Sequence, residues 1–315
     1  HEANLAYGVT SVHDPSAFDD TVFATAERIE AGLQKGPRVT STGGVIYGAK
    51  SKDRSRVDSL EDAQLHVARK KAKGATSIKS YQQPSRRQRQ WLIAAARDAG
   101  INVYPEGGGD LFHNMSMLVD GHTGIEHALP VAPLYADVRG LYAASGAGYT
   151  PTLLVAYGGL SGEHWFFQTE ALLEDEKFLR FAPEEWVARN LRRRSVLVSD
   201  DDWFFREVAQ AAAVLQDEGV PVLTGAHGQV QGVGVHWEMW ALGGAMGPLN
   251  ALRTATLDAA WYIGVEQDLG SIEVGKLADM VLIDGNPLED LRLSVEIVEV
   301  MQGGTRFNAE TLDEL

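Results

Sequence analysis

Residues Ala75–Glu106, ATSIKSYQQPSRRQRQWLIAAARDAGINVYPE, contain the pattern that decides the fold. A short apolar run, Thr76–Lys79, predicts a β-strand, and Ser85–Gly100 predicts a helix that ends at a glycine, as helices often do. A second apolar run, Ile101–Tyr104, predicts another strand. Because strands that alternate with helices form a parallel sheet, this unit indicates an α/β fold.

The same arrangement recurs outward along the chain, and its apolar runs end in residues that can bind a metal or transfer a proton. These residues are His13 (GVTSVH), Lys79 (ATSIK), Glu106 (INVYPE), His127 (GIEH) and His227 (VPVLTGAH). In a (β/α)8 barrel the chemistry takes place at the C-terminal ends of the strands. We therefore expect these side chains to converge on one mouth, and the pattern indicates a metal-assisted hydrolase.

The run of strands sets the expected domain organisation. Strands are predicted near Val9, Arg38, Thr76, Ile101, Gly124, Tyr149 and Val220, with a glycine-rich loop over residues 42–48. Closing a barrel takes eight strands. We therefore expect a TIM-like (β/α) barrel that lacks its first strand over residues 1–265, and a small C-terminal β element over 266–315.

Residues 158–202 interrupt the rhythm of strands and helices and are rich in aromatic side chains. A long insertion between barrel strands is interpreted most simply as a lid over the mouth. The alternative is a set of surface helices that pack their aromatic side chains on the barrel.

Composition excludes several classes of protein. A net charge of −15 over 315 residues argues against nucleic acid or an anionic membrane as a partner. No window approaches the roughly 18 apolar residues of a membrane span, and no signal segment is visible. The absence of cysteine excludes disulfides, thiolate metal sites and a cysteine nucleophile. The sequence does not assign a cellular compartment, because a cysteine-free chain is compatible with the cytoplasm, the periplasm and secretion.

Several longer motifs resemble one known family. Leu269–Pro287 (LGSIEVGKLADMVLIDGNP), Gly124–Pro130 (GIEHALP), Ser77–Tyr81 (SIKSY) and Gly225–Trp240 (GAHGQVQGVGVHWEMW) are similar to segments of the amidohydrolase superfamily, including its imidazolonepropionase-like members. Together they resemble a branch often fused to a Tricorn- or TolB-like β-propeller. The tail motif resembles the part of the β-sandwich that flanks the metal-binding barrel in this superfamily.

The resemblance implies a site for one or two metal ions, usually zinc, with Lys79, Glu106, His127 and His227 as ligands. Lys79 matches a lysine that can be carbamylated to bridge two metals, since an ammonium cannot ligate a cation. Glu106 stands where the family usually has histidine, and His227 stands where it has an aspartate. Both residue types can bind zinc.

The identity of the general base stays open. The family's aspartate both ligates the metal and accepts the proton, and a histidine beside a dication is a weaker proton acceptor. His227, Glu238 and His236 are therefore all candidate catalytic residues. His13, Tyr81 and Tyr157 are candidate substrate-pocket residues.

The predicted function is hydrolysis of amide or peptide-like C–N bonds by metal-activated water, on a small-molecule or peptide-like substrate. One alternative is a catalytically impaired or silent protein on the same fold, and another is deaminase or lactonase chemistry at the same site. No His-x-His pair, the family's first-strand signature, occurs in the chain. We therefore expect the full-length protein to carry the first barrel strand, and the resemblance implies an N-terminal β-propeller as well. Exposed barrel edges are expected to favour a homo-oligomer.

Overall fold

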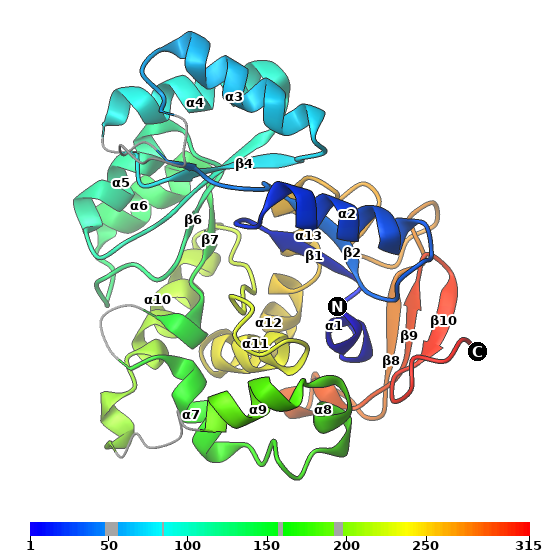
Figure 1. The fold of residues 1–315 in the computed structure, drawn as a ribbon. Coiled ribbons are helices and arrows are strands. Elements are labelled where there is room, and N and C mark those ends of the chain that lie inside the picture. The colour runs from blue at the N-terminus through cyan, green and yellow to red at the C-terminus, as the bar shows by residue number, and fades with distance from the viewer. Residues whose placement is uncertain (48–55, 84, 157–159, 192–197) are drawn as a thin grey trace.

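A computed structural model describes residues 1–47, 56–83, 85–156, 160–191 and 198–315. Strands and helices alternate along the first two-thirds of the chain, and an antiparallel sheet lies near the C-terminus (Figure 1). The strands of the alternating part are β1 (Ser11–Asp14), β2 (Arg38–Ser41), β3 (Ile46–Tyr47), β4 (Ser77–Tyr81), β5 (Asn102–Pro105), β6 (Gly124–Glu126) and β7 (Gly148–Thr150).

These strands pair in parallel as β1–β2, β3–β4–β5 and β6–β7. Parallel bridges between Glu106 and Glu126 and between Tyr149 and Val222 extend the order to the segment that precedes His227. The described residues thus form a row of parallel strands in chain order and no closed barrel. The α/β class is confirmed, whereas the absence of a first strand stays a prediction.

One sequence expectation about this row is corrected. Residues 42–48 were expected to form a loop, but Ile46 and Tyr47 form β3 and pair with the last two residues of β4. Ile46 is buried, and burying its side chain against β4 favours the paired, extended backbone despite the preceding glycines.

Helices separate the strands, as the sequence predicts. The predicted helix over Ser85–Gly100 is confirmed: Ser85 and Gln88 form a capping box at its start, and Gly100 ends it with a left-handed φ of 68°. The helices outside the insertion are α1 (Glu2–Ala6), α2 (Asp19–Glu30), α3 (Leu60–Ala72), α4 (Arg86–Ala99), α5 (Leu111–Asp120), α6 (Ala136–Ser145), α10 (Phe205–Asp217), α11 (Val233–Met246), α12 (Pro248–Thr254) and α13 (Leu257–Ile263).

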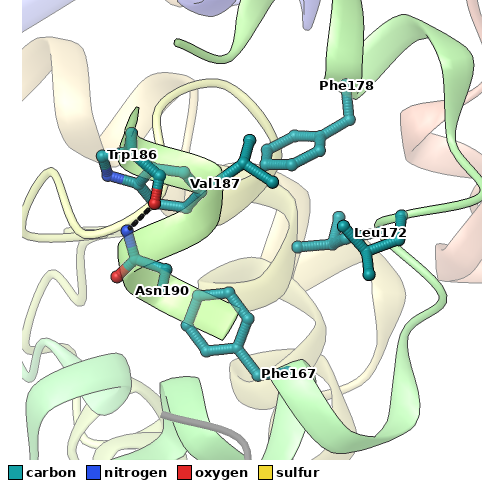
Figure 2. Close-up of a pocket in the computed structure, with 7 residues that line it drawn as sticks. Phe167, Leu172, Phe178, Trp186, Val187 and Asn190 are labelled. Atoms are coloured by element: carbon teal, nitrogen blue, oxygen red, sulfur yellow. Dashed lines mark hydrogen bonds between the residues drawn. The ribbon is translucent and has the colours of Figure 1, made fainter. Parts of the chain in front are cut away.

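The insertion is helical and has an apolar interior of its own. It contains α7 (Gly162–Thr169), α8 (Glu176–Phe181), α9 (Glu184–Leu191) and the short 3-10 turn η3 (Asp200–Asp202). Phe167, Phe178 and Trp186 lie around an apolar pocket between these helices (Figure 2). Phe166 stacks on Trp237 of α11 with ring centroids 5.0 Å apart. The aromatic side chains thus pack the insertion and attach it to α11, and its role as a lid stays a prediction.

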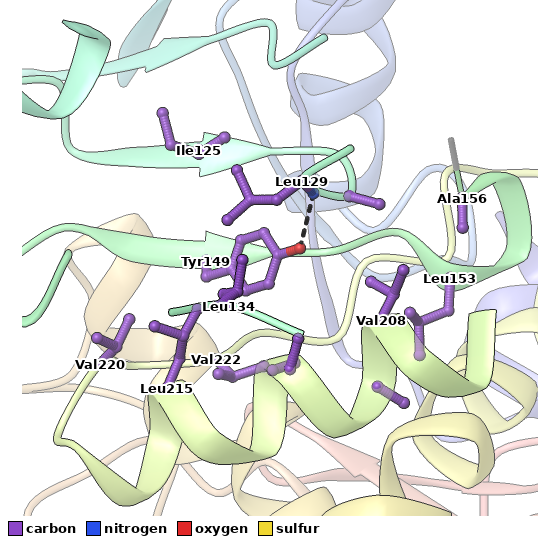
Figure 3. Close-up of a cluster of buried hydrophobic side chains, with 14 of the residues drawn as sticks. Ile125, Leu129, Leu134, Tyr149, Leu153, Ala156, Val208, Leu215, Val220 and Val222 are labelled. Atoms are coloured by element: carbon purple, nitrogen blue, oxygen red, sulfur yellow. Dashed lines mark hydrogen bonds between the residues drawn. The ribbon is translucent and has the colours of Figure 1, made fainter. Parts of the chain in front are cut away.

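A buried cluster holds β6 and β7 against α10 (Figure 3). Ile125 and Tyr149 of the two strands and Leu215 of the helix belong to this cluster, and all three are almost fully buried. The Tyr149 hydroxyl also accepts the backbone N–H of Leu129 at 2.9 Å. This packing fixes the ends of β6 and β7, which carry His127 and the 3-10 turn η1 (Leu153–Val155).

The tail forms a three-stranded antiparallel sheet, ordered β10–β9–β8, from β8 (Met280–Ile283), β9 (Ile297–Gln302) and β10 (Thr305–Asn308). A 3-10 turn, η4 (Leu291–Val295), joins β8 to β9. Arg38 of β2 forms an ion pair with Asp279 at 2.9 Å, which joins this sheet to the parallel strands. The predicted C-terminal β element is present. Among the described residues, no helix is long and apolar enough to cross a membrane.

Candidate active site

A buried ion cluster lies at the C-terminal ends of β5 and β6. It includes Lys79, which is the middle residue of β4, whereas the sequence pattern predicted that it ends the strand. The Lys79 ammonium lies 2.9 Å from Glu106 Oε2 and also donates to Glu126. Burial alone would lower the pKa of Lys79, but the carboxylates of Glu126 and Glu106 outweigh it, and the pKa is raised. Lys79 is therefore a cation held between two carboxylates.

His127 completes this cluster on the side of β7. Its Nε2 lies 3.0 Å from Glu106 Oε1, and its Nδ1 lies 2.8 Å from the hydroxyl of Thr152. Burial would raise the pKa of Glu106, but the hydrogen bond from His127 and the charge of Lys79 lower it to about 2. Glu106 is thus a carboxylate at neutral pH that holds Lys79 with one oxygen and His127 with the other.

His227 lies beside this pair and reaches solvent. It follows the strand segment at Val222, and its ring centroid lies 5.0 Å from that of His127. Partial burial lowers the pKa of His227, the nearby His127 acts in the same direction, and a side-chain hydrogen bond with Gln229 opposes both. The structure thus brings Lys79, Glu106, His127 and His227 together.

Three non-glycine residues of this site have left-handed backbone conformations. The φ angles are 76° at His127, 48° at Thr152 and 56° at His227. Such conformations cost about 1–3 kcal/mol each and tend to cluster at functional sites. At His127 the conformation has a visible consequence: neighbouring residues of a regular strand point to opposite faces, yet Glu126 and His127 both reach the cluster.

This backbone strain gives a prediction for His227. At a φ of 56°, His227→Gly is expected to be more stable than His227→Ala by about 1 kcal/mol, because only glycine adopts this conformation without steric cost. Neither variant has an imidazole, so urea unfolding of the two isolates the backbone term. Glu207 on α10 is the control site, because glycine there should be less stable than alanine. Equal stability of the two His227 variants would refute the strain.

The other two candidates for the general base, His236 and Glu238, lie on α11 and have structural partners. The ring nitrogens of His236 lie 3.0 Å from the Ser294 hydroxyl and 3.0 Å from the Tyr7 carbonyl. The Glu238 carboxyl group is fully buried and accepts the N–H groups of Leu153 and Leu154 at 2.7 and 3.0 Å. These contacts favour a structural role for both residues and leave His227 as the accessible imidazole.

Two of the three predicted pocket residues, His13 and Tyr81, lie on described strands. His13 of β1 contacts the Thr40 hydroxyl at 3.0 Å, and its ring meets the edge of Tyr104 with centroids 5.0 Å apart. Burial lowers the pKa of His13 to about 4. Tyr81 ends β4 and lies against Tyr47 of β3. Tyr157 lies outside the described residues.

Sequence reasoning missed two members of the cluster. Glu126 directly precedes His127 in GIEHALP, and strand alternation gave no reason to place both at one site. Thr152 follows β7 and orients His127 through its hydroxyl. A signal for Glu126 was available, since a carboxylate on an otherwise apolar strand needs a cationic partner.

The predicted zinc site can be tested against this geometry. Lys79 is an ammonium between two carboxylates, so it has no lone pair for a metal or for carbon dioxide. Among the residues that the structure describes, no three histidine, aspartate or glutamate side chains are grouped so that they could hold a metal ion. As arranged, the cluster does not fit the metal that the resemblance implies.

Comparison with solved structures identifies the fold. A Xaa-Pro dipeptidase superposes with a TM-score of 0.71 at 21% identity, covering 98% of this chain and 78% of that one. Molinate hydrolase gives 0.73 at 16% identity, covering 99% and 75%. Bottromycin amidohydrolase gives 0.72 at 20% identity, covering 99% and 74%. At these identities the likeness establishes a shared fold.

Two curated relatives match over short stretches. Imidazolonepropionase from Symbiobacterium thermophilum is 53% identical over 38 residues, which are 12% of this chain and 9% of that protein. 5'-Deoxyadenosine deaminase from Methanobrevibacter smithii is 54% identical over 37 residues, which are 12% of this chain and 8% of that protein. The matched stretches thus span less than a tenth of either relative.

A sequence model of the amidohydrolase family matches residues 2–306. Because this match extends over nearly the whole chain, the protein belongs to the amidohydrolase family. The predicted family is confirmed, and this membership supports the predicted enzyme class, a hydrolase of amide or peptide-type C–N bonds.

Proposed function

We propose that this protein hydrolyses an amide or peptide-like C–N bond of a small-molecule or peptide-like substrate at the mouth beside His227. One observation carries the proposal. The solvent-accessible imidazole of His227 lies next to the buried Glu106–His127 pair, with 5.0 Å between the two ring centroids. A titratable group in contact with a fixed ion cluster, at strand ends, is the arrangement expected of an active site.

Each residue of the cluster has a different role in this proposal. His127 has both ring nitrogens engaged, by Glu106 and Thr152, so it holds the geometry of the site. His227 accepts a proton from the attacking water and returns it to the leaving amine, as a general base and then an acid. Lys79 neutralises part of the negative charge of Glu106 and Glu126, which keeps the buried cluster stable.

His227→Gln is expected to lower kcat by about 10²–10⁴-fold, the usual contribution of a general base. A panel of dipeptides and N-acyl amides would identify a substrate, and the variant would then be assayed on it. His113→Gln on α5 is the control and should keep full activity. A His227 variant with the activity of the parent would refute this assignment.

Hydrolysis by zinc-activated water, which the family resemblance implies, stays a prediction. Because the donor set as arranged does not fit a metal, no step above passes through one. Metal analysis of the purified protein, before and after incubation with zinc, measures directly whether the chain binds it. The predicted β-propeller, first strand and homo-oligomer also stay predictions.

A second candidate function is that of a catalytically impaired relative, and the ion pairs of Lys79 favour it. In that case Lys79 stabilises the fold in place of a metal, and the mouth binds ligands without turnover. Absence of hydrolysis across amide, deaminase and lactone substrates, with and without zinc, would support this candidate over the first.

A further inference from the structure

A short segment, from the last residue of β7 to Thr152, contacts both imidazole-bearing parts of the site. The Thr150 carbonyl accepts the backbone N–H of His127 at 2.9 Å, and the Thr152 hydroxyl lies 2.8 Å from His127 Nδ1. The loop that leads to His227 packs on the same segment. A Cβ at Gly225 would lie 2.3 Å from the Thr150 methyl carbon, so the backbone of this loop lies directly against the strand end. This segment thus supports one histidine by hydrogen bonds and the loop of the other by close packing.

The segment needs a restraint from outside, because its backbone is strained. Thr152 has a φ of 48°, which a β-branched residue rarely adopts, and such conformations persist only where the surrounding structure imposes them. Two neighbours restrain the turn that follows. A Cβ at Gly162 of α7 would lie 2.6 Å from the Leu153 carbonyl oxygen. From α11, Glu238 accepts the N–H groups of Leu153 at 2.7 Å and Leu154 at 3.0 Å, one with each carboxyl oxygen.

The position of these two N–H groups gives Glu238 control over Thr152. The N–H of Leu153 belongs to the planar peptide group that follows Thr152. Fixing this N–H therefore fixes the rotation of the Thr152 backbone about ψ, and with it the direction of the hydroxyl toward His127. Glu238 is fully buried, and burying a polar group is costly unless it is hydrogen-bonded. Its two bonds to consecutive backbone donors account for a carboxyl group at this place in α11.

We propose that Glu238 is a positioning residue of the active site. By fixing the peptide group after Thr152, it holds the Thr152 hydroxyl on His127 and keeps the strand end in place under the loop of His227. It thereby sets the separation of the two imidazoles, whose ring centroids lie 5.0 Å apart. The effect on hydrolysis rests on the proposed function, whereas the contact between Thr152 and His127 can be measured without any substrate.

The experiment compares four variants of the whole chain. Glu238→Leu removes both acceptors, and Glu238→Gln keeps one carbonyl oxygen for one of the two N–H groups. Thr152→Val removes the hydroxyl from a side chain of nearly the same shape, so it breaks the last link directly. Trp240→Phe on the same helix is the control, because the Trp240 indole N–H bonds the Leu291 carbonyl and the Ser294 hydroxyl of η4 and has no bond to η1 among the described residues.

Nuclear Overhauser effects between the Thr152 methyl group and the His127 ring protons report the contact, with the ring signals assigned by their loss in His127→Gln. The parent and Trp240→Phe are expected to show this effect, Glu238→Gln to show it weakened, and Glu238→Leu to lose it. If Glu238→Leu does not fold, Glu238→Gln decides the matter. An effect of parental strength in every folded Glu238 variant would overturn the proposal.

With a substrate in hand, kcat should fall by about 100-fold in Glu238→Leu and by about 10-fold in Glu238→Gln and Thr152→Val, the range for losing a partner that orients a site residue. KM should change little. Because Glu238 acts through Thr152, the double variant Glu238→Leu/Thr152→Val should be no slower than Glu238→Leu alone, and losses that simply add would refute the link. A lost Thr152–His127 contact in a protein with no hydrolysis would refute the proposed function and leave the positioning role of Glu238 standing.

Discussion

Lys79→Met is expected to lower the free energy of unfolding by about 3–5 kcal/mol, the cost of removing one partner of a buried ion pair. The methionine side chain fills most of the same space but leaves Glu126 without the ammonium and Glu106 with only its contact to His127. Their side chains are only 14% and 10% exposed, so water cannot replace the ammonium. Urea unfolding at neutral pH measures the loss.

Two companion variants make this result specific. Glu126→Gln in the Lys79→Met background removes one of the two unpaired charges and should recover part of the lost stability. Lys71→Met on α3, an exposed lysine, should change the stability by about 0.5 kcal/mol or less. A loss below about 1 kcal/mol for Lys79→Met would show that the cluster tolerates its two carboxylates without the ammonium, contrary to the cost of burying unpaired charge.

The strands of the row other than β3 could be predicted from sequence, most clearly where a short apolar run leads to a polar residue. The run before Lys79 and the run before Glu106 pair in parallel, with Lys79 opposite Tyr104. The convergence of Lys79, Glu106, His127 and His227 follows from that pairing. The pattern could not predict the protonation state of Lys79. That state depends on Glu126, whose side chain strand alternation would place on the opposite face from His127.

The left-handed backbone at His127, Thr152 and His227 was likewise beyond sequence reasoning. None of these is a residue type that favours positive φ as strongly as glycine, so the conformation is imposed by tertiary packing. His236 and Glu238 show the same limit. They flank Trp237 on a helix that is buried on several sides, and only the positions of Tyr7, Ser294 and η1 show the hydrogen bonds that favour a structural role for both.

Glu238 is expected to make the stability of this protein fall as the pH rises. Burial raises the pKa of Glu238 to about 8, although two backbone N–H groups act in the opposite direction. The folded state therefore holds this proton more tightly than the unfolded chain, whose glutamates titrate near their usual value of about 4.3. The stabilisation is complete below that value and is lost as the pH rises toward 8.

Glu238→Gln isolates this term, because glutamine is a neutral group of nearly the same shape. Each unit of pKa shift is worth about 1.4 kcal/mol, so the stability of the parent relative to Glu238→Gln should fall by about 4 kcal/mol between pH 4.5 and 8. Buried His13, His122 and His236 have lowered pKa values and make stability rise with pH below about 6.5. They are present in both proteins, so their contribution cancels in the difference. Urea unfolding across this range measures the difference, and a difference that stays constant with pH would mean that Glu238 titrates as an ordinary carboxylate.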